Sequence, residues 1–383
     1  MVDSTSQDLT GDSDPILKAN PILETDEPQE TEPITETDPV VESDPILDWD
    51  TTLQTDETQA TDPTQTSEES LKSDSTEGED LVAIPILLGT TSNIQRAFKA
   101  VNPNGAQRFT LTNPGVPGNM PLGFNSGGVP GDFHQQGIQK TRFNCFVVSG
   151  SAPSFSYFYT TGPDNRVANV VKIDSKLTHA GGIQVAGGVL AIGIEKVGQS
   201  DGGSRVHFYD LSRPTPLQFP RVITRSTETA GAVGLVQAAD GNYIAVVGGW
   251  DSKRLTFHRF ASLYQNSGIQ GVAVTVSASG WQKYQNINLF LDSSQRLWLV
   301  GMHTSGYPIG NDDWGDLYQV SIDWARGRVT IDKREKMHFY RSGEGPRFQW
   351  GAGYHFDGFR FEVFSCEAQM PNSGVVRCNK WTG

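Results

Sequence analysis

From about residue 130 to the end of the chain, apolar residues occur in short runs rather than at helical spacing. The runs are rich in Val, Ile, Phe, Tyr and Trp, and clusters of Gly, Asn, Asp and Ser separate them. Runs of this kind are typical of strands, and the clusters between them are typical of turns. The pattern therefore predicts an all-β domain.

A weak internal repeat points to the architecture. His134-Gln135-Gln136-Gly137-Ile138-Gln139 is identical to His179-Ala180-Gly181-Gly182-Ile183-Gln184 at four of six positions. Each copy opens a unit, and the second unit holds four strand-like runs within about 45 residues, the size of one propeller blade. A unit that recurs at this period indicates a β-propeller.

Later groups of runs extend the count. The expected strands of units two to five lie at 183–184, 189–195, 204–210 and 218–223; at 232–236, 243–247, 255–258 and 272–276; at 287–291, 296–300, 316–320 and 328–331; and at 351–355, 359–364 and 375–378. The last group lacks a fourth strand, which residues 108–112 or 81–88 could supply by closing the ring. The sequence predicts a five-bladed β-propeller, with six blades or a β-sandwich as alternatives.

The composition changes near residue 80. Residues 1–80 contain 24 of the 44 acidic residues and two of the 30 basic ones, so they carry a charge of −22 and the rest of the chain carries +8. Within this segment Trp49 is the only aromatic residue, and Pro recurs at roughly every sixth position. We expect a disordered, acidic, Pro/Thr-rich tail over 1–80 and a β-propeller domain over 81–383. The tail acts either as a spacer or as a contact for basic surfaces.

Targeting signals and cysteines say little about the compartment. The first residues show no basic and apolar pattern typical of a signal peptide, and the apolar run 81–88 is too short for a membrane span and contains Pro85. Cys366 and Cys378 flank a Pro-Asn-Ser-Gly sequence at 371–374. If this sequence is a hairpin turn, the two cysteines face each other as a disulfide, which indicates an oxidising compartment, or as two buried thiols. Cys145 is expected to be a free core thiol.

Candidate site residues gather on one face of the predicted propeller. The approach to each inner strand and the loop between the second and third strands of each blade lie on the same face, which we call the mouth. The candidate catalytic residues on this face are His134, His179 and Glu195, and the candidate ligand-binding residues are Trp250, Asp251, His303, Asp312, Asp313, Trp314 and Asp316.

Each candidate has a structural alternative. His134 and His179 could bond backbone carbonyls between blades. Carboxylates at 312, 313 and 316 offer oxygen ligands for a divalent metal ion such as Ca²⁺, but their spacing is not that of an EF-hand and turn formation also explains them. Tryptophans at 250 and 314 could stack on a sugar or pack between blades. His207, His258 and His338 fall in strand-like runs, and we expect them to lie away from the mouth.

Motifs leave the activity open. The sequence contains no His-Glu-x-x-His, no Cys-x-x-Cys and no Walker A loop. Its Lys and Arg residues are spread out, so we expect no nucleic-acid binding. The leading hypothesis is a module that binds a small molecule, a glycan or a protein partner at the mouth. The alternative is a hydrolase or lyase, with His134, His179 and His303 around a metal ion or with His179 and Glu195 as an acid/base pair.

Overall fold

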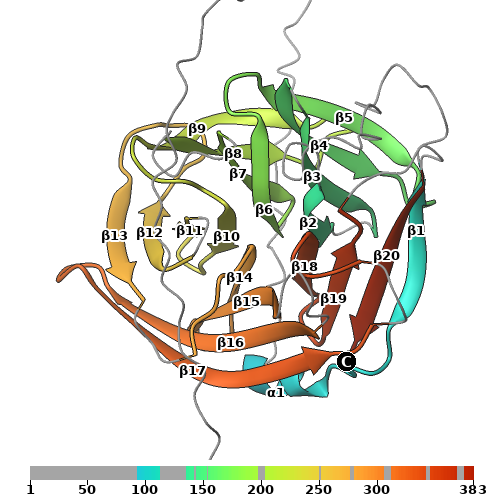
Figure 1. Ribbon diagram of the computed structural model, residues 1–383. Coiled ribbons are helices and arrows are strands. Elements are labelled where there is room, and N and C mark those ends of the chain that lie inside the picture. Colours follow the sequence, from blue (N-terminus) through green and yellow to red (C-terminus); the bar gives the residue numbers. More distant parts are fainter. Residues whose placement is uncertain are drawn as a thin grey trace, which may run out of the picture. The chain divides into compact units, whose positions relative to one another are not determined.

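The computed structural model describes residues 93–112, 135–141, 144–152, 154–196, 203–249, 252–276, 280–305, 312–341, 346–368 and 375–383. The acidic tail predicted over 1–80, and the domain boundary predicted beside it, lie outside these residues and stay predictions. Nearly all described elements are strands, and they form the five blades of a β-propeller around a central axis (Figure 1).

Blades I to III each contain four consecutive antiparallel strands, ordered from the axis outwards. Blade I consists of β2 (Gln135–Lys140), β3 (Phe146–Ala152), β4 (Phe155–Thr161) and β5 (Val167–Asp174). Blade II consists of β6 (His179–Ala186), β7 (Val189–Glu195), β8 (Ser204–Asp210) and β9 (Leu217–Arg225). Blade III consists of β10 (Ala232–Gln237), β11 (Tyr243–Gly248), β12 (Arg254–Phe260) and β13 (Gln270–Thr275).

Blades IV and V complete the ring. Blade IV consists of β14 (Asn286–Leu291), β15 (Leu297–Ser305), β16 (Asp312–Asp323) and β17 (Arg328–Phe339). Blade V consists of β18 (Gly351–Phe356), β19 (Phe361–Cys366), β20 (Val375–Thr382) and β1 (Gln107–Thr112). A short helix, α1 (Ile94–Ala100), precedes β1 and contacts β17. The described part of the chain has no helix with the length and apolar character of a membrane span.

The ring closes as the sequence indicated. Strand β1 comes from the N-terminal side of the domain and pairs with β20, the last strand, with Phe109 opposite Cys378. This pairing confirms the closing strand expected at 108–112. A single parallel bridge between Ala352 and Gly137 joins the inner strands of blades V and I. Because the sheets follow one another around an axis as five groups of four strands, the five-bladed prediction is confirmed and the alternatives of six blades or a sandwich are excluded.

Burial follows the position of a strand in its blade. The inner and second strands are buried along most of their length because neighbouring blades cover both of their faces. The outer strands β9 and β17 alternate between exposed and covered positions. A hydrophobic cluster fills each of the five seams between blades, for example Phe158 with Ile192 between blades I and II, and Phe109 with Phe364 beside blade I. The hydrophobic core therefore consists of five separate clusters, one between each pair of neighbouring blades.

Amide side chains hold the inner strands together at the axis. Gln184 on β6 accepts hydrogen bonds at Oε1 from the backbone N–H groups of Leu235 (2.7 Å) and Leu289 (2.7 Å), and its Nε2 donates to the Leu289 carbonyl (2.7 Å). One buried glutamine of blade II therefore reaches blades III and IV. These bonds satisfy backbone groups that have no strand partner at the axis.

Two further amides connect the remaining blades. Gln139 on β2 donates through Nε2 to Asn288 Oδ1 (3.1 Å), which also accepts from the backbone N–H of Tyr354 (2.8 Å). Asn288 Nδ2 donates to the Ile183 carbonyl (3.2 Å). Gln139, Gln184 and Asn288, which we call the axial amides, thus join all five inner strands.

Glycines let the inner strands approach closely enough for these bonds. A Cβ atom at Gly182 would lie 2.6 Å from the carbonyl oxygen of Gln285, and one at Gly353 would overlap the carbonyl oxygen of Ile138. Contacts this short exclude any side chain. Because Gly182 and Gln184 belong to the repeated Gly-Ile-Gln sequence, this part of the repeat serves the packing of the axis.

Replacement of Gln184 tests the role of the axial amides. Gln184→Ala leaves two backbone N–H groups and one carbonyl buried without partners, and we expect a loss of about 3 kcal/mol in the free energy of unfolding. Urea unfolding of both variants measures this change. The control is Gln237→Ala. The Gln237 amide donates to the Gly241 carbonyl in its own turn, near the surface, so this substitution should cost less than about 0.5 kcal/mol. Equal effects of the two substitutions would contradict the proposed role.

Candidate functional site

The candidate residues fall into two groups. His134, Trp250 and Asp251 lie outside the described residues, so their predicted roles stay predictions. His179 and Glu195 meet in blade II, whereas the candidates at 303, 312, 313, 314 and 316 all lie on strands β15 and β16 of blade IV.

His179 and Glu195 form a buried pair. They start β6 and end β7, where they are direct cross-strand partners, and His179 Nδ1 lies 3.3 Å from Glu195 Oε1. Each residue is 1% exposed. Glu195 Oε2 also accepts a hydrogen bond from the backbone N–H of Ala230 (2.6 Å), which precedes blade III. The pair therefore joins blade II to blade III from within the seam.

Four of the candidates share one face of blade IV. His303 on β15 is opposite Trp314 on β16, and Trp314 is opposite His338 on β17. Directly paired residues project to the same side of a sheet, and so do residues two positions apart along a strand. Asp312 and Asp316 therefore lie on the same face as Trp314.

The outer part of this face carries an array of three rings, of which Tyr340 is exposed and Trp314 and His338 are partly buried. The rings of Trp314 and His338 are stacked with centroids 4.4 Å apart, and the rings of His338 and Tyr340 are 4.2 Å apart. Asp312 Oδ1 lies 3.1 Å from His338 Nε2, and Lys336 Nζ lies 3.9 Å from the Trp314 ring centroid. We call Asp312, Trp314, Lys336, His338 and Tyr340 the aromatic surface.

Contacts below and beside the rings hold this surface in place. Phe339 points to the opposite side of β17 into the core, and Tyr340 follows directly. The Tyr340 N–H donates to the Pro103 carbonyl (2.9 Å), and its carbonyl accepts from Trp381 Nε1 (3.1 Å). The Tyr340 residue is nevertheless 53% exposed. The Trp314 indole N–H donates to Ser305 Oγ (3.1 Å). The surface is therefore preorganised.

A buried carboxylate, that of Asp316, lies on the inner part of the same face. Asp316 is fully buried, and Lys333 Nζ (2.8 Å), Tyr284 Oη (2.6 Å) and His303 Nε2 (3.5 Å) surround its carboxylate. Burial alone raises the pKa of Asp316, but its contacts with His303, Lys333 and Tyr284 outweigh burial and lower it. In this conformation, Asp316 offers no surface to a ligand.

Asp313 makes its contacts in the seam between blades IV and V. It lies on the opposite face of β16, where its Oδ1 accepts from Thr304 Oγ1 (2.6 Å) and from the Phe348 N–H (3.1 Å), and Arg341 Nε lies 3.3 Å from Oδ2. Burial raises the pKa of Asp313, and these partners only partly oppose that effect. The three carboxylates at 312, 313 and 316 therefore do not converge. Among the described residues, no three His, Cys, Asp or Glu side chains are grouped to hold a metal ion.

His338 lies on the outer strand β17, as its sequence position predicted, but near the mouth end of that strand, opposite Trp314. The register of β16 against β17 shifts between Leu317 and Tyr318. Without this bulge, Met337 would be opposite Trp314; with it, His338 is. A bulge moves every later residue of the strand to the other face, and no pattern in the sequence marks this one.

The sequence also contains a motif that is typical of a catalytic nucleophile and that the motif search above did not include. Residues 198–202 read Gly-Gln-Ser-Asp-Gly, the Gly-x-Ser-x-Gly spacing of a nucleophile elbow. The elbow requires a turn from a strand into a helix. Here the segment connects the antiparallel strands β7 and β8, and its own conformation lies outside the described residues.

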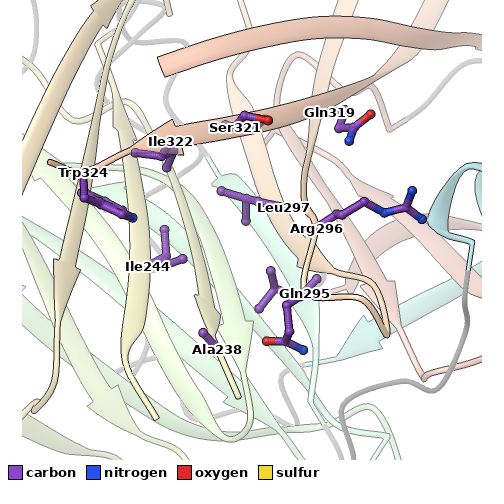
Figure 2. A pocket seen from close by; sticks show the side chains of 11 residues that line it. Ala238, Ile244, Gln295, Arg296, Leu297, Gln319, Ser321, Ile322 and Trp324 are labelled. Atoms are coloured by element: carbon purple, nitrogen blue, oxygen red, sulfur yellow. The ribbon is translucent and has the colours of Figure 1, made fainter. Parts of the chain in front are cut away.

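A groove of about 370 Å³ lies between blades III and IV at the end opposite the mouth (Figure 2). Its apolar lining includes Ile244, Leu297, Ile322 and Trp324. Two glutamines bridge the seam here: Gln295 Oε1 accepts from the Ala239 N–H (2.8 Å), and Gln270 Nε2 donates to the Trp324 carbonyl (2.9 Å). The groove has no Asp, Glu, His or Lys among its described lining residues, so it lacks groups for acid/base chemistry.

Solved structures resemble this chain only at low identity and low TM-score. No protein-family model and no curated protein matches the chain. The endo-arabinanase from Bacillus licheniformis is similar in structure over 66% of this chain and 95% of its own, with 11% identity and a TM-score of 0.40. Virginiamycin B lyase from Staphylococcus aureus, in a catalytically inactive form, is similar over 73% and 99%, with 9% identity and a TM-score of 0.37. The α-L-arabinofuranosidase from Fusarium graminearum is similar over 71% and 96%, with 9% identity and a TM-score of 0.40.

Asp316→Asn tests whether the buried carboxylate supports the aromatic surface. Because the folded-state pKa of Asp316 is lowered, its ionised form stabilises the fold above the unfolded pKa of about 3.9, and this contribution disappears as the pH falls through the folded-state value. We expect the substitution to cost about 3–5 kcal/mol at pH 7 and less near pH 3. Denaturant unfolding at both pH values measures the difference.

The control for this substitution is Asp332→Asn. Asp332 belongs to the same blade, but its side chain is 65% exposed and its Oδ2 lies 3.6 Å from Arg334 Nη2. Its replacement should therefore cost less than about 1 kcal/mol of unfolding free energy. A cost for Asp316→Asn that stays constant from pH 7 to pH 3 would contradict the assigned ionised state.

Proposed function

We propose that this protein is a glycan-binding propeller whose contact surface is the aromatic surface of blade IV. The observation that carries the proposal is the array of Trp314, His338 and Tyr340, whose outermost ring is exposed while its backbone is held by bonds on both sides. Exposed aromatic side chains that are rigidly positioned are typical of binding surfaces, because ordering them on binding costs little entropy.

The chemistry of the surface suits a sugar. A pyranose ring has an apolar face of C–H groups and a rim of hydroxyl groups. Tyr340 supplies a ring for the apolar face. Asp312, with its side chain 57% exposed, offers carboxylate oxygens to the hydroxyl groups, and Lys336 offers N–H donors. A ligand that stacks on Trp314 displaces Lys336 from the ring, at a cost of about 0.5–1 kcal/mol for an exposed cation–π contact.

The predicted ligand-binding residues divide into two roles under this proposal. Asp312 and Trp314 contact the glycan. His303 and Asp316 lie beneath them and position the strand face, since both are buried. Asp313 holds blade IV to the segment that precedes blade V and takes no direct part.

Catalysis at blade II is the second function, and one observation favours it. His179 Nδ1 lies 3.3 Å from Glu195 Oε1, the proximity that an acid/base pair requires. Against it, the pair is buried and Glu195 also holds the Ala230 N–H. We therefore assign the pair to joining blades II and III, and expect no turnover there.

Glycan binding is tested by an array screen followed by calorimetry with the best oligosaccharide. We expect Tyr340→Ala and Trp314→Ala each to weaken binding at least about tenfold, since a well-placed aromatic contact contributes more than about 1 kcal/mol. Tyr340 is the more informative position because its ring is exposed, and its truncation leaves the core intact.

Two matched variants locate the site. Phe359→Ala removes another exposed ring, in the β18–β19 turn of blade V, and should leave the affinity unchanged. Trp324→Ala alters the groove in Figure 2 and should also leave it unchanged. Loss of binding in Trp324→Ala with full binding in Tyr340→Ala would move the site to the groove, and no binding by any glycan would refute the proposal.

Glu195→Gln separates the two functions. The amide oxygen still accepts from the Ala230 N–H, but the side chain loses its charge and its basicity. We expect unchanged glycan affinity and no product from the bound oligosaccharide with either the wild type or the variant, measured by chromatography. Cleavage by the wild type that disappears in Glu195→Gln would establish the enzyme alternative instead.

A further inference from the structure

Two buried cysteines face each other in the blade that closes the ring. Cys366 on β19 and Cys378 on β20 are direct cross-strand partners, as their positions around 371–374 predicted, and both are free thiols in this structure. They are completely or almost completely buried in the cluster between blades V and I. The segment 369–374 between their strands lies outside the described residues.

The hydrogen-bond pattern of the ladder shows which type of pair they form. The N–H of Glu367 donates to the carbonyl of Arg377 (3.1 Å), so 367 and 377 are a hydrogen-bonded pair. Such pairs alternate with non-hydrogen-bonded pairs in an antiparallel ladder, which makes Cys366 and Cys378 a non-hydrogen-bonded pair. In these pairs the Cα atoms are about 4.5 Å apart and the side chains are closer, within the range of about 4.4–6.8 Å that disulfides span.

The neighbouring inner strand leaves room for the sulfur atom of Cys366. Gly351 on β18 is the partner of Cys366 on the other side, and a Cβ atom at Gly351 would overlap Cys366 Sγ. Cys366 therefore has space for its thiol that a larger neighbour would remove. A rotation about χ1 of Cys366 towards β20 needs no change in the backbone register.

We infer that Cys366 and Cys378 form a disulfide when the chain folds under oxidising conditions. The reaction with oxidised glutathione balances as two exchanges. One cysteine thiolate attacks the glutathione disulfide and releases one glutathione thiolate; the second cysteine thiolate attacks the mixed disulfide and releases the other. The protein loses two protons and two electrons, and one glutathione disulfide becomes two thiols.

The bond forms during folding rather than afterwards. In the folded chain burial raises the pKa of both thiols, which removes the reactive thiolate, and the surrounding core excludes the oxidant. The native protein should therefore react slowly once reduced. This inference is independent of the proposed glycan binding.

The disulfide would secure ring closure. Cys378 has Cys366 on one side and Phe109 of the closing strand β1 on the other. A covalent link between β19 and β20 keeps in place the strand on which β1 docks. It also restricts the unfolded chain, which is the main source of disulfide stabilisation.

The test refolds the full-length chain in a glutathione redox buffer and counts thiols after denaturation. The chain has three cysteines, and we expect one free thiol in the wild type, none in Cys145→Ser and two in Cys366→Ser. Tryptic digestion should yield peptide 361–377 linked to peptide 378–380, and reduction should separate them. Three free thiols in the wild type, or a disulfide mapped to Cys145, would overturn the inference.

Thermal unfolding gives a second readout. The oxidised wild type should melt on the order of 5 °C above the reduced wild type, and the same shift should appear in Cys145→Ser. The variant with Cys366→Ser and Cys378→Ser should show no difference between oxidising and reducing buffers. A melting temperature that is insensitive to reductant in the wild type would contradict the role in ring closure.

Discussion

The axial amides are the interaction on which the rest of the structure depends. Five inner strands converge at the axis, where the backbone groups on their axis-facing edges have no strand partner, and Gln139, Gln184 and Asn288 supply such partners with their side chains. Their bonds are satisfied in a buried environment, where an unmade hydrogen bond is costly. These side chains and the inner-strand glycines therefore bring the five inner strands close together at the axis.

Blade IV differs from the other blades in the length of its two outer strands. β16 and β17 each contain 12 residues, whereas the other described strands contain at most nine. The ends of these strands opposite the mouth pack in the seam between blades III and IV, and the mouth ends carry the rings of Trp314 and His338. The buried Asp316 lies at the transition between the two regions, with Lys333 and Tyr284 as its partners.

The fold was largely predictable from the sequence, and the site was predictable only in part. Strand runs, turns and the length of the units predict the blades, because a second strand such as β7, which is buried on both faces, is a nearly continuous apolar run. The closing strand was predictable from the missing fourth strand of the last blade. Asp312 and Trp314 were predicted as ligand-binding residues from their place in a long mouth loop, and they lie on β16 in the candidate surface.

Other features depend on three-dimensional detail that leaves no pattern in the sequence. His338 joins Trp314 through the bulge at Leu317 and Tyr318. Tyr340 was not predicted, because the bonds that fix its backbone come from Pro103 and Trp381, which are distant in the chain. The sequence also did not predict the burial of Asp313 and Asp316 on opposite faces of β16, since polar residues near a loop are usually exposed.

Hydroxyl-radical footprinting with and without a bound oligosaccharide tests the central claim most directly, since it reports the accessibility of individual side chains. The account predicts that oxidation of Tyr340 and Trp314 slows on binding, while oxidation of Tyr264, an exposed ring of blade III, stays the same. Protection of Trp324 in the groove, with Tyr340 unchanged, would contradict it.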